Sequence, residues 1–214
     1  MRFAEAVERL AVLPDPLPEP AAALMPVIVA GDGNPPPRIP PTGQAGRPAA
    51  VLALLYPDDR GISRVVLIER TSSGGHHSGE VSLPGGKAEP GDADAVATAL
   101  REAEEEVGLD TAAVGVRVVG TLGAFWIPVS DFAVTPVVAV AERRPTLVPA
   151  PREVARIVEP PMATFLPGAP IRMVERTVAE PRWQLRFGAY DVEGLTVWGA
   201  TARILSQLGA ILAS

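Results

Sequence analysis

The spacing of hydrophobic residues divides the chain into helices and strands. Hydrophobic side chains recur every three or four positions through residues 3–13, which is the period of an amphipathic helix. Continuous apolar runs at 49–57 and 132–141 are typical of buried strands. A polar turn at 58–61 separates the first of these runs from another at 63–70, so the pattern predicts a hairpin there.

The remaining segments complete a mixed pattern of elements. A strand is expected at 114–122, a short helix near 161–166, a hairpin within 183–194 and a closing helix at 201–213. The order of these elements does not repeat, which favours an α+β or mixed α/β domain.

A longer helix is predicted at 94–107, in the middle of the chain. Its apolar positions form one stripe, and Gly108 provides a C-terminal cap. The stripe consists of Val96, Leu100, Ala103 and Val107.

The first 48 residues differ in character from the rest. After the predicted helix, prolines recur up to Pro48 and favour extended structure. We therefore divide the chain into a Pro-rich extension with a short helix (1–48) and a main domain (49–214). Two interpretations of the extension remain open: it wraps on the main domain or builds a homodimer, or it is a disordered linker.

Composition excludes several classes of function. The chain has 214 residues, a net charge of −6, 47% hydrophobic residues and no cysteine. It can therefore build a core, but not a disulfide or a thiolate site. An acidic chain is a poor partner for nucleic acids or membranes. Neither a signal sequence nor a run long enough to span a bilayer is evident, so we expect a cytoplasmic protein.

Three glutamates of the central helix suggest a metal site. Glu102, Glu105 and Glu106 stand three and four positions apart and share one face, where their charges repel. Carboxylate oxygens suit Mg²⁺ or Mn²⁺, and a small diphosphate substrate can share such ions. Arg101 could brace Glu105, while the glycines of the preceding loop allow a backbone carbonyl to complete the metal site. The structural alternative is a solvated acidic helix without function. The Pro84–Gly86 loop, at a fixed distance before the helix, argues against this alternative.

This segment resembles the Nudix box, Gly-x5-Glu-x7-Arg-Glu-U-x-Glu-Glu-x-Gly-U, where U is a bulky aliphatic residue. Residues 101–109, REAEEEVGL, follow its second half, with a small alanine at the first U position. One extra residue precedes the helix, so counting from either side places Asp92 or Ala93 at the first glutamate position. The resemblance implies an α/β/α sandwich with a mixed sheet and divalent-metal hydrolysis of a nucleoside diphosphate derivative. It also implies the following roles: metal ligands Glu102, Glu105, Glu106 and the Gly86 backbone, with Arg101 as the bracing residue.

The residues before the box resemble the signature of the coenzyme A pyrophosphatase branch. Residues 66–86 keep its spacing, but Ile68 replaces a threonine and Gly75 an arginine that is a candidate phosphate contact. The resemblance implies cleavage of coenzyme A to 3′,5′-ADP and 4′-phosphopantetheine. It makes the following residues candidates for substrate binding: Arg70, His76, His77 and Gly85.

Other positions have both functional and structural interpretations. Distal glutamates can serve as the base in this family, so Glu153 is a candidate, although it could equally be a cap or a solvated acid. Arg152 and Arg203 could meet a 3′-phosphate or simply be solvated, and Trp198 fits packing better than nucleotide stacking. Two other functions also remain open: hydrolysis of NADH, ADP-ribose or a nucleoside triphosphate, and non-catalytic nucleotide binding.

Overall fold

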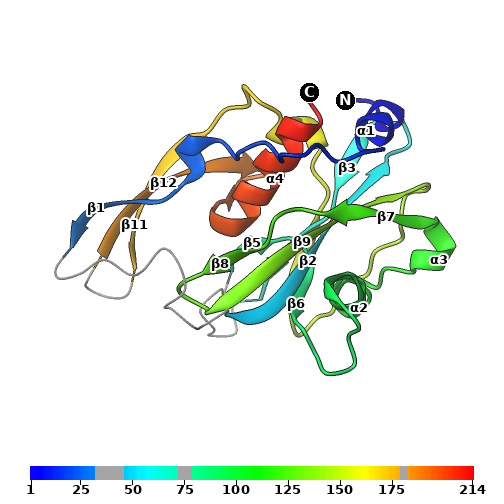
Figure 1. Cartoon of the computed structure of the whole chain (residues 1–214), viewed down its shortest axis with the longest axis horizontal. Coiled ribbons are helices and arrows are strands. Elements are labelled where there is room, and N and C mark those ends of the chain that lie inside the picture. Colours follow the sequence, from blue (N-terminus) through cyan, green and yellow to red (C-terminus); the bar gives the residue numbers. More distant parts are fainter. Residues whose placement is uncertain (32–45, 72–78, 179–182) are drawn as a thin grey trace.

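A mixed six-stranded sheet forms the centre of the molecule (Figure 1). The computed structural model describes residues 1–31, 46–71, 79–178 and 183–214. Within the sheet, β2 pairs in parallel with β9, and all other pairings are antiparallel. The strands run in the order β3-β2-β9-β7, with β6 on β2 and β8 on β9. Their bounds are β2 Arg47–Pro57, β3 Ser63–Val65, β6 Gly85–Lys87, β7 Val116–Thr121, β8 Phe125–Ile127 and β9 Phe132–Ala141.

Two smaller antiparallel sheets flank the central one. The first has the order β10-β4-β5, and the second has the order β1-β12-β11 with β13 paired to β12. The bounds of the first are β10 Val154–Val158, β4 Leu67–Arg70 and β5 Val81–Ser82. The bounds of the second are β1 Val27–Gly31, β11 Arg172–Val178, β12 Trp183–Val192 and β13 Leu195–Val197.

Helices cover both faces of the central sheet. Alternate residues of β2, among them Leu52 and Leu54, pack beneath α2 (Ala95–Val107). The intervening residues, such as Leu55, pack with α1 (Phe3–Arg9) and α4 (Gly199–Ile211). This arrangement confirms the predicted α/β/α sandwich with a mixed sheet. Short helices complete the structure: η1 Ala22–Leu24, α3 Thr111–Val114 and η2 Met162–Phe165.

The central helix begins and ends where the sequence predicts. The Asp94 side chain accepts a hydrogen bond from the Ala97 N–H and caps the first turn. Gly108 ends the helix in the left-handed conformation, with φ of 65°. Ala103 and Val107 are buried, as the hydrophobic stripe requires, whereas Glu104 is exposed.

Two predicted strand patterns are wrong in detail. The run at 63–70 is split at Val66, because β3 pairs with β2 whereas β4 pairs with β10. The expected hairpin within 183–194 is instead one continuous strand, β12, which turns only at its end toward β13. Gly188 does not turn the chain: it allows η1 to pack closely, since a Cβ there would lie 2.6 Å from the Ala23 carbonyl oxygen.

The amino-terminal extension contributes to the core. Ala6, Leu10 and Leu24 are buried in the same cluster as the residues of α4. The Pro-rich segment also contains β1, which pairs with β12 and which the sequence did not predict, while α1 ends at Arg9 rather than residue 13. Residues 32–45 lie outside the described part. The division into an extension and a main domain stays a prediction, as do the homodimer and the cytoplasmic location.

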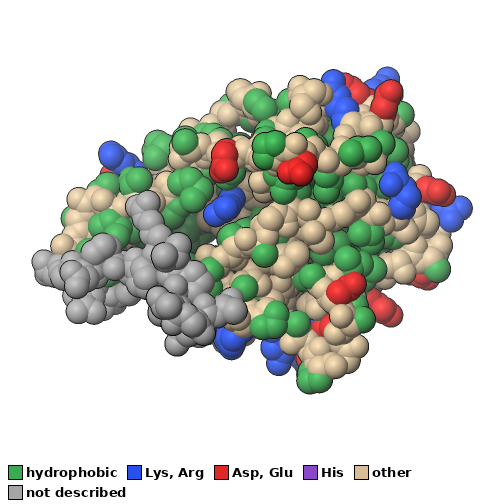
Figure 2. Space-filling view, viewed as in Figure 1, with side chains coloured by type: hydrophobic (Ala, Val, Ile, Leu, Met, Phe, Trp, Pro, Cys, Tyr) green, Lys and Arg blue, Asp and Glu red, His purple; other side chains and the backbone are tan. Residues whose placement is uncertain are grey.

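Surface charge is unevenly distributed on the face shown in Figure 2. Charged side chains gather toward the end that carries α1 and α3, whereas the surface over β7, β8 and β9 is mainly hydrophobic or uncharged. Among the described residues, no helix has both the length and the hydropathy to cross a membrane.

Candidate active site

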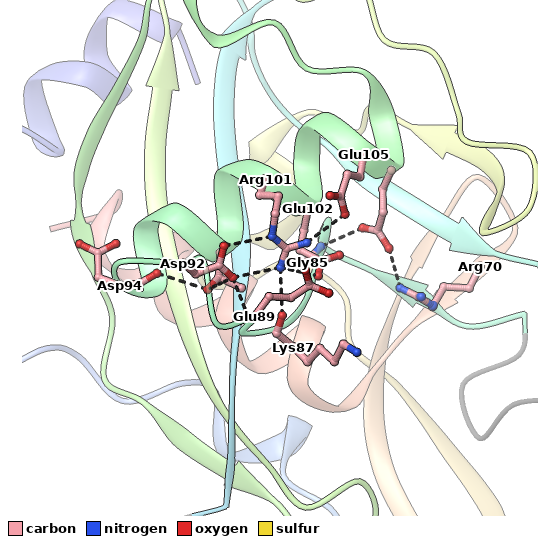
Figure 3. A network of polar contacts seen from close by, with 11 residues as sticks. Arg70, Gly85, Lys87, Glu89, Asp92, Asp94, Arg101, Glu102 and Glu105 are labelled. Carbon is pink, nitrogen blue, oxygen red and sulfur yellow. Dashed lines mark hydrogen bonds and ion pairs between the residues drawn. The ribbon is translucent and has the colours of Figure 1, made fainter.

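Arg101 is the centre of a polar network on one side of α2 (Figure 3). Its Nη1 lies 2.9 Å from Glu105 Oε2, and its Nη2 lies 3.1 Å from Glu102 Oε1. The same Nη2 donates to the carbonyl oxygen of Lys87, at 3.1 Å, and so ties the helix to β6. The guanidinium therefore orients two of the predicted ligand carboxylates at once. Its contact with Glu105 confirms the pairing that the helical spacing of the two residues predicts.

Asp92 is a site residue whose role the sequence left ambiguous. Its two carboxylate oxygens each accept a hydrogen bond from Arg101, at 3.1 Å, and one of them also accepts from Thr98. Hydrogen bonds from Arg101 hold the pKa of the Asp92 carboxyl well below its usual range. Asp92 is the residue that counting forward from Gly86 places at the first glutamate position of the box. Because it is Asp92 that braces Arg101, the one extra residue of this chain lies between Asp92 and the helix.

The two glycines of β6 are required by close backbone contacts. A Cβ at Gly85 would lie 2.3 Å from the Ala50 carbonyl oxygen on β2. A Cβ at Gly86 would lie 2.5 Å from Glu102 Oε1. The Glu102 carboxylate thus packs directly against the backbone of Gly86, because glycine has no side chain there. Gly86 is also the position predicted to supply a carbonyl ligand.

Glu106 is almost completely buried, with 1% of its side chain exposed. One oxygen accepts from the Gly85 N–H and the other from Arg70 Nη1, both at 2.9 Å. Burial raises the pKa of the Glu106 carboxyl to about 7, against the opposing effects of Gly85 and Arg70. Arg70, predicted to bind substrate, therefore also neutralises a predicted metal ligand.

A turn before β10 brings Glu153 to the same site. The Ala150 N–H donates to the Glu106 carbonyl oxygen, and the Thr71 N–H donates to the Glu153 carbonyl oxygen, each at 2.9 Å. The Glu153 side chain is exposed. Burial raises the pKa of the Glu102 carboxyl, Arg101 opposes this, and the charges of Glu105 and Glu153 add to the rise. The Glu153 charge thus contributes to the electrostatic environment of Glu102.

The donor atoms suit a hard divalent cation in their chemistry. Three carboxylates and a backbone carbonyl at Gly86 are oxygen ligands of the kind that Mg²⁺ and Mn²⁺ prefer. Across the described ranges, no three acidic or imidazole side chains converge into a ready-formed ligand set. Arg101 contacts one oxygen of Glu105 and Arg70 contacts one oxygen of Glu106, so each carboxylate keeps lone-pair sites for an ion while its arginine contact remains.

The structure brings most of the predicted site together. Glu106 contacts Gly85 and Arg70, and Glu102 lies against Gly86. Arg101 links Glu102 with Glu105, and the charge of Glu153 acts on Glu102. His76 and His77 lie outside the described residues.

Comparisons with known proteins identify a family. A model of the NUDIX domain matches residues 46–176. Nudix hydrolase 15, a mitochondrial protein of Arabidopsis thaliana, is 38% identical over 167 residues, which cover 76% of this chain and 58% of that protein. An uncharacterized Nudix hydrolase, NudL, of Photorhabdus laumondii is 35% identical over 147 residues, covering 67% of this chain and 74% of that protein.

Coverage differs between these relatives. The chain spans 58% and 55% of the lengths of two Arabidopsis relatives, the mitochondrial protein and a chloroplastic Nudix hydrolase 22. Among solved structures, a Nudix hydrolase from M. smegmatis, RenU, is 26% identical with a TM-score of 0.46, covering 55% of this chain and 72% of that one.

Proposed function

The chain belongs to the Nudix family, and on that premise we propose that it is a metal-dependent pyrophosphohydrolase. Its substrate is coenzyme A or an acyl-coenzyme A, which it cleaves at the diphosphate to 3′,5′-ADP and 4′-phosphopantetheine or its acyl form. The observation that carries this proposal is the Arg101 network, in which one guanidinium contacts Asp92, Glu102 and Glu105 beside bare backbone at Gly86.

The proposed ligands of Mg²⁺ or Mn²⁺ are the carboxylates of Glu102, Glu105 and Glu106 and the carbonyl of Gly86. When bound, such an ion activates water and offsets the charge that builds on the transferring phosphorus group. Arg101, held by Asp92, fixes the direction of the Glu102 carboxylate. Arg70 partly neutralises Glu106, so that the site remains foldable when no ion is bound.

Glu153 is the proposed general base. Its side chain is exposed and lies near Glu102, so it can accept a proton from an attacking water at the edge of the site. The exchange of Glu153 for glutamine would then lower kcat with little change in KM, and would flatten the acidic limb of the pH–rate profile. An unchanged pH–rate profile in this variant would show that Glu153 is not the general base.

The choice of coenzyme A rests on the spacing of residues 66–86, including Arg70 and the glycines of β6. A second candidate keeps the chemistry and changes the substrate to NADH, ADP-ribose or a nucleoside triphosphate. The glycine at position 75, where the coenzyme A signature has an arginine, favours this alternative.

Product analysis separates these candidates. We expect the purified chain with Mg²⁺ or Mn²⁺ to release 3′,5′-ADP and 4′-phosphopantetheine from coenzyme A, with a higher kcat/KM than for NADH, ADP-ribose or ATP. A higher kcat/KM for NADH, ADP-ribose or ATP would identify that compound, rather than coenzyme A, as the preferred substrate. Hydrolysis of none, with metal present, would favour non-catalytic nucleotide binding.

A further inference from the structure

Two arginines near the start of α4 lie on aromatic rings. The guanidinium of Arg176, on β11, lies 4.8 Å from the ring centre of Trp198, the residue that precedes α4. The guanidinium of Arg203, within α4, lies 4.4 Å from the ring centre of Phe125 on β8. Trp198 is the N-cap of α4 and Arg203 lies just beyond its first turn, so both cations belong to the beginning of this helix.

A chain of short contacts connects Arg176 with the candidate active site. Arg176 Nη1 lies 3.1 Å from Glu80 Oε1, and the Glu80 carbonyl oxygen accepts from the Arg70 N–H at 3.0 Å. Arg70 in turn contacts Glu106 at 2.9 Å.

The helix carrying Arg203 is anchored to the same place. The Thr201 hydroxyl donates to the carbonyl oxygen of Val81, the residue after Glu80, at 3.2 Å. The α4 helix is thus anchored at β5, next to the strand that carries Arg70, and β11 reaches the same region through the Arg176–Glu80 ion pair.

These cations are only partly neutralised. Half of the Arg176 side chain is exposed, and an ion pair as open as that with Glu80 adds little to folding stability. Over the residues that the structure describes, Arg203 forms no ion pair with a carboxylate. Stacking on a ring holds a guanidinium in a fixed plane while its N–H groups stay available, which suits bidentate recognition of phosphate.

We propose that Arg176 and Arg203 form a subsite for a phosphate monoester remote from the scissile diphosphate, such as the 3′-phosphate of coenzyme A. This inference rests on the proposed function, because it assumes a substrate bound at Glu102 and Gly86. The coenzyme A signature has an arginine at position 75, where this chain has a glycine. In this chain, Arg176 of β11 and Arg203 of α4 supply the positive charge instead. Trp198, already stacked on Phe187 with ring centres 4.5 Å apart, is the rigid support for Arg176.

The test compares substrates that differ only in that phosphate. For the wild type, we expect kcat/KM for coenzyme A to exceed that for 3′-dephospho-coenzyme A. In Arg176→Met and Arg203→Met, the ratio of the two values should fall about tenfold or more, because each variant removes a charge-assisted contact. A ratio that stays at the wild-type value in both variants would overturn the subsite.

Two further variants control for indirect effects. Arg186→Met is a matched control, because Arg186 lines a groove on the outer face of the same sheet with Val27 and Glu175, and it should leave the ratio unchanged. Arg176→Lys keeps the charge but loses the planar fork, so its ratio should lie between those of the wild type and Arg176→Met. This variant also serves if the methionine variant does not fold.

A binding measurement tests the subsite without catalysis. By calorimetry, the full-length wild type should bind 3′,5′-ADP about tenfold or more tightly than AMP, and Arg176→Met should remove this preference. Failure of the proposed function would appear as absence of coenzyme A hydrolysis with this preference intact. Equal affinity of the wild type for the two nucleotides would contradict the subsite, whatever the enzyme hydrolyses.

Discussion

Two networks of arginines and carboxylates lie at opposite ends of β2, and they differ in charge balance. At the end of the strand, the buried Tyr56 donates to Glu159, which also pairs with Arg144 at 3.2 Å, while Arg64 pairs with Asp58 at 2.9 Å. A cavity of about 240 Å³ there is lined by equal numbers of both charges: Asp58, Asp59, Glu159, Arg60, Arg64 and Arg144. We therefore interpret this end network as structural.

The network near the beginning of β2 has an excess of acid. Arg101 and Arg70 face a larger set of carboxylates, namely Asp92, Glu102, Glu105, Glu106 and Glu153. Burial raises the pKa of Glu102 and Glu106, and repulsion from neighbouring carboxylates adds to the rise. A fold gains nothing from such an excess unless a cation or a proton relieves it, so the comparison separates a structural network from a functional one.

The largest expected effect is a loss of turnover when a glutamate of the acid-rich network near the beginning of β2 is replaced by the uncharged glutamine. Glu102→Gln should lower turnover of the diphosphate substrate at least a hundredfold, and Glu105→Gln at least tenfold, because each removes a proposed metal ligand. The matched variant Glu159→Gln, in the balanced network, should stay within about twofold of wild type. Equal losses from both networks, measured with intact circular dichroism spectra, would erase the distinction between them.

The next effect is on stability and concerns Glu106 in metal-free protein. Its folded-state pKa of about 7 lies above the ordinary value of 4.5. The folded state therefore holds the proton more tightly, and the free energy of unfolding should decrease as pH rises from about 4.5 to about 7, by about 2–3 kcal/mol.

Urea denaturation in EDTA across this pH range measures the effect. Glu106→Gln should remove most of the decrease, whereas Glu104→Gln, on the exposed face of the same helix, should keep it. A wild-type profile that is flat or rises between these pH values would contradict the burial of an unbalanced charge.

A smaller effect is expected from releasing Arg101. Asp92→Asn should lower turnover about tenfold by weakening the two hydrogen bonds that orient the guanidinium, and should also weaken Mn²⁺ binding. Asp94→Asn is the control, since asparagine caps a helix as well as aspartate does. Wild-type Mn²⁺ affinity in Asp92→Asn would show that Asp92 acts on folding alone.

The smallest effect should come from the balanced network. Tyr56→Phe removes a single hydrogen bond to Glu159 and should cost about 1 kcal/mol of unfolding free energy, with turnover unchanged. Urea denaturation and a kinetic assay on the same sample measure both. A large loss of turnover here would indicate that the two ends of β2 are coupled.

The sequence predicts those parts that depend on local chemistry. The α2 helix follows from its hydrophobic period and Gly108, and the pairing of Arg101 with Glu105 follows from helical spacing. Contacts made over long range could not be predicted. The burial of Glu106 requires Gly85 and Arg70 from other strands, and the split at Val66 depends on which strand each half meets. The hairpin within 183–194 was wrong because sequence alone does not reveal that η1 packs over Gly188 in a continuous strand.

Titration with Mn²⁺, followed by electron paramagnetic resonance, tests most directly whether the acid excess around Arg101 holds a divalent ion. The wild type should bind Mn²⁺, Glu102→Gln and Glu105→Gln should each lower the affinity at least tenfold, and Glu159→Gln should leave it unchanged. Equal Mn²⁺ affinity in all four proteins, or no binding to the wild type, would contradict the account.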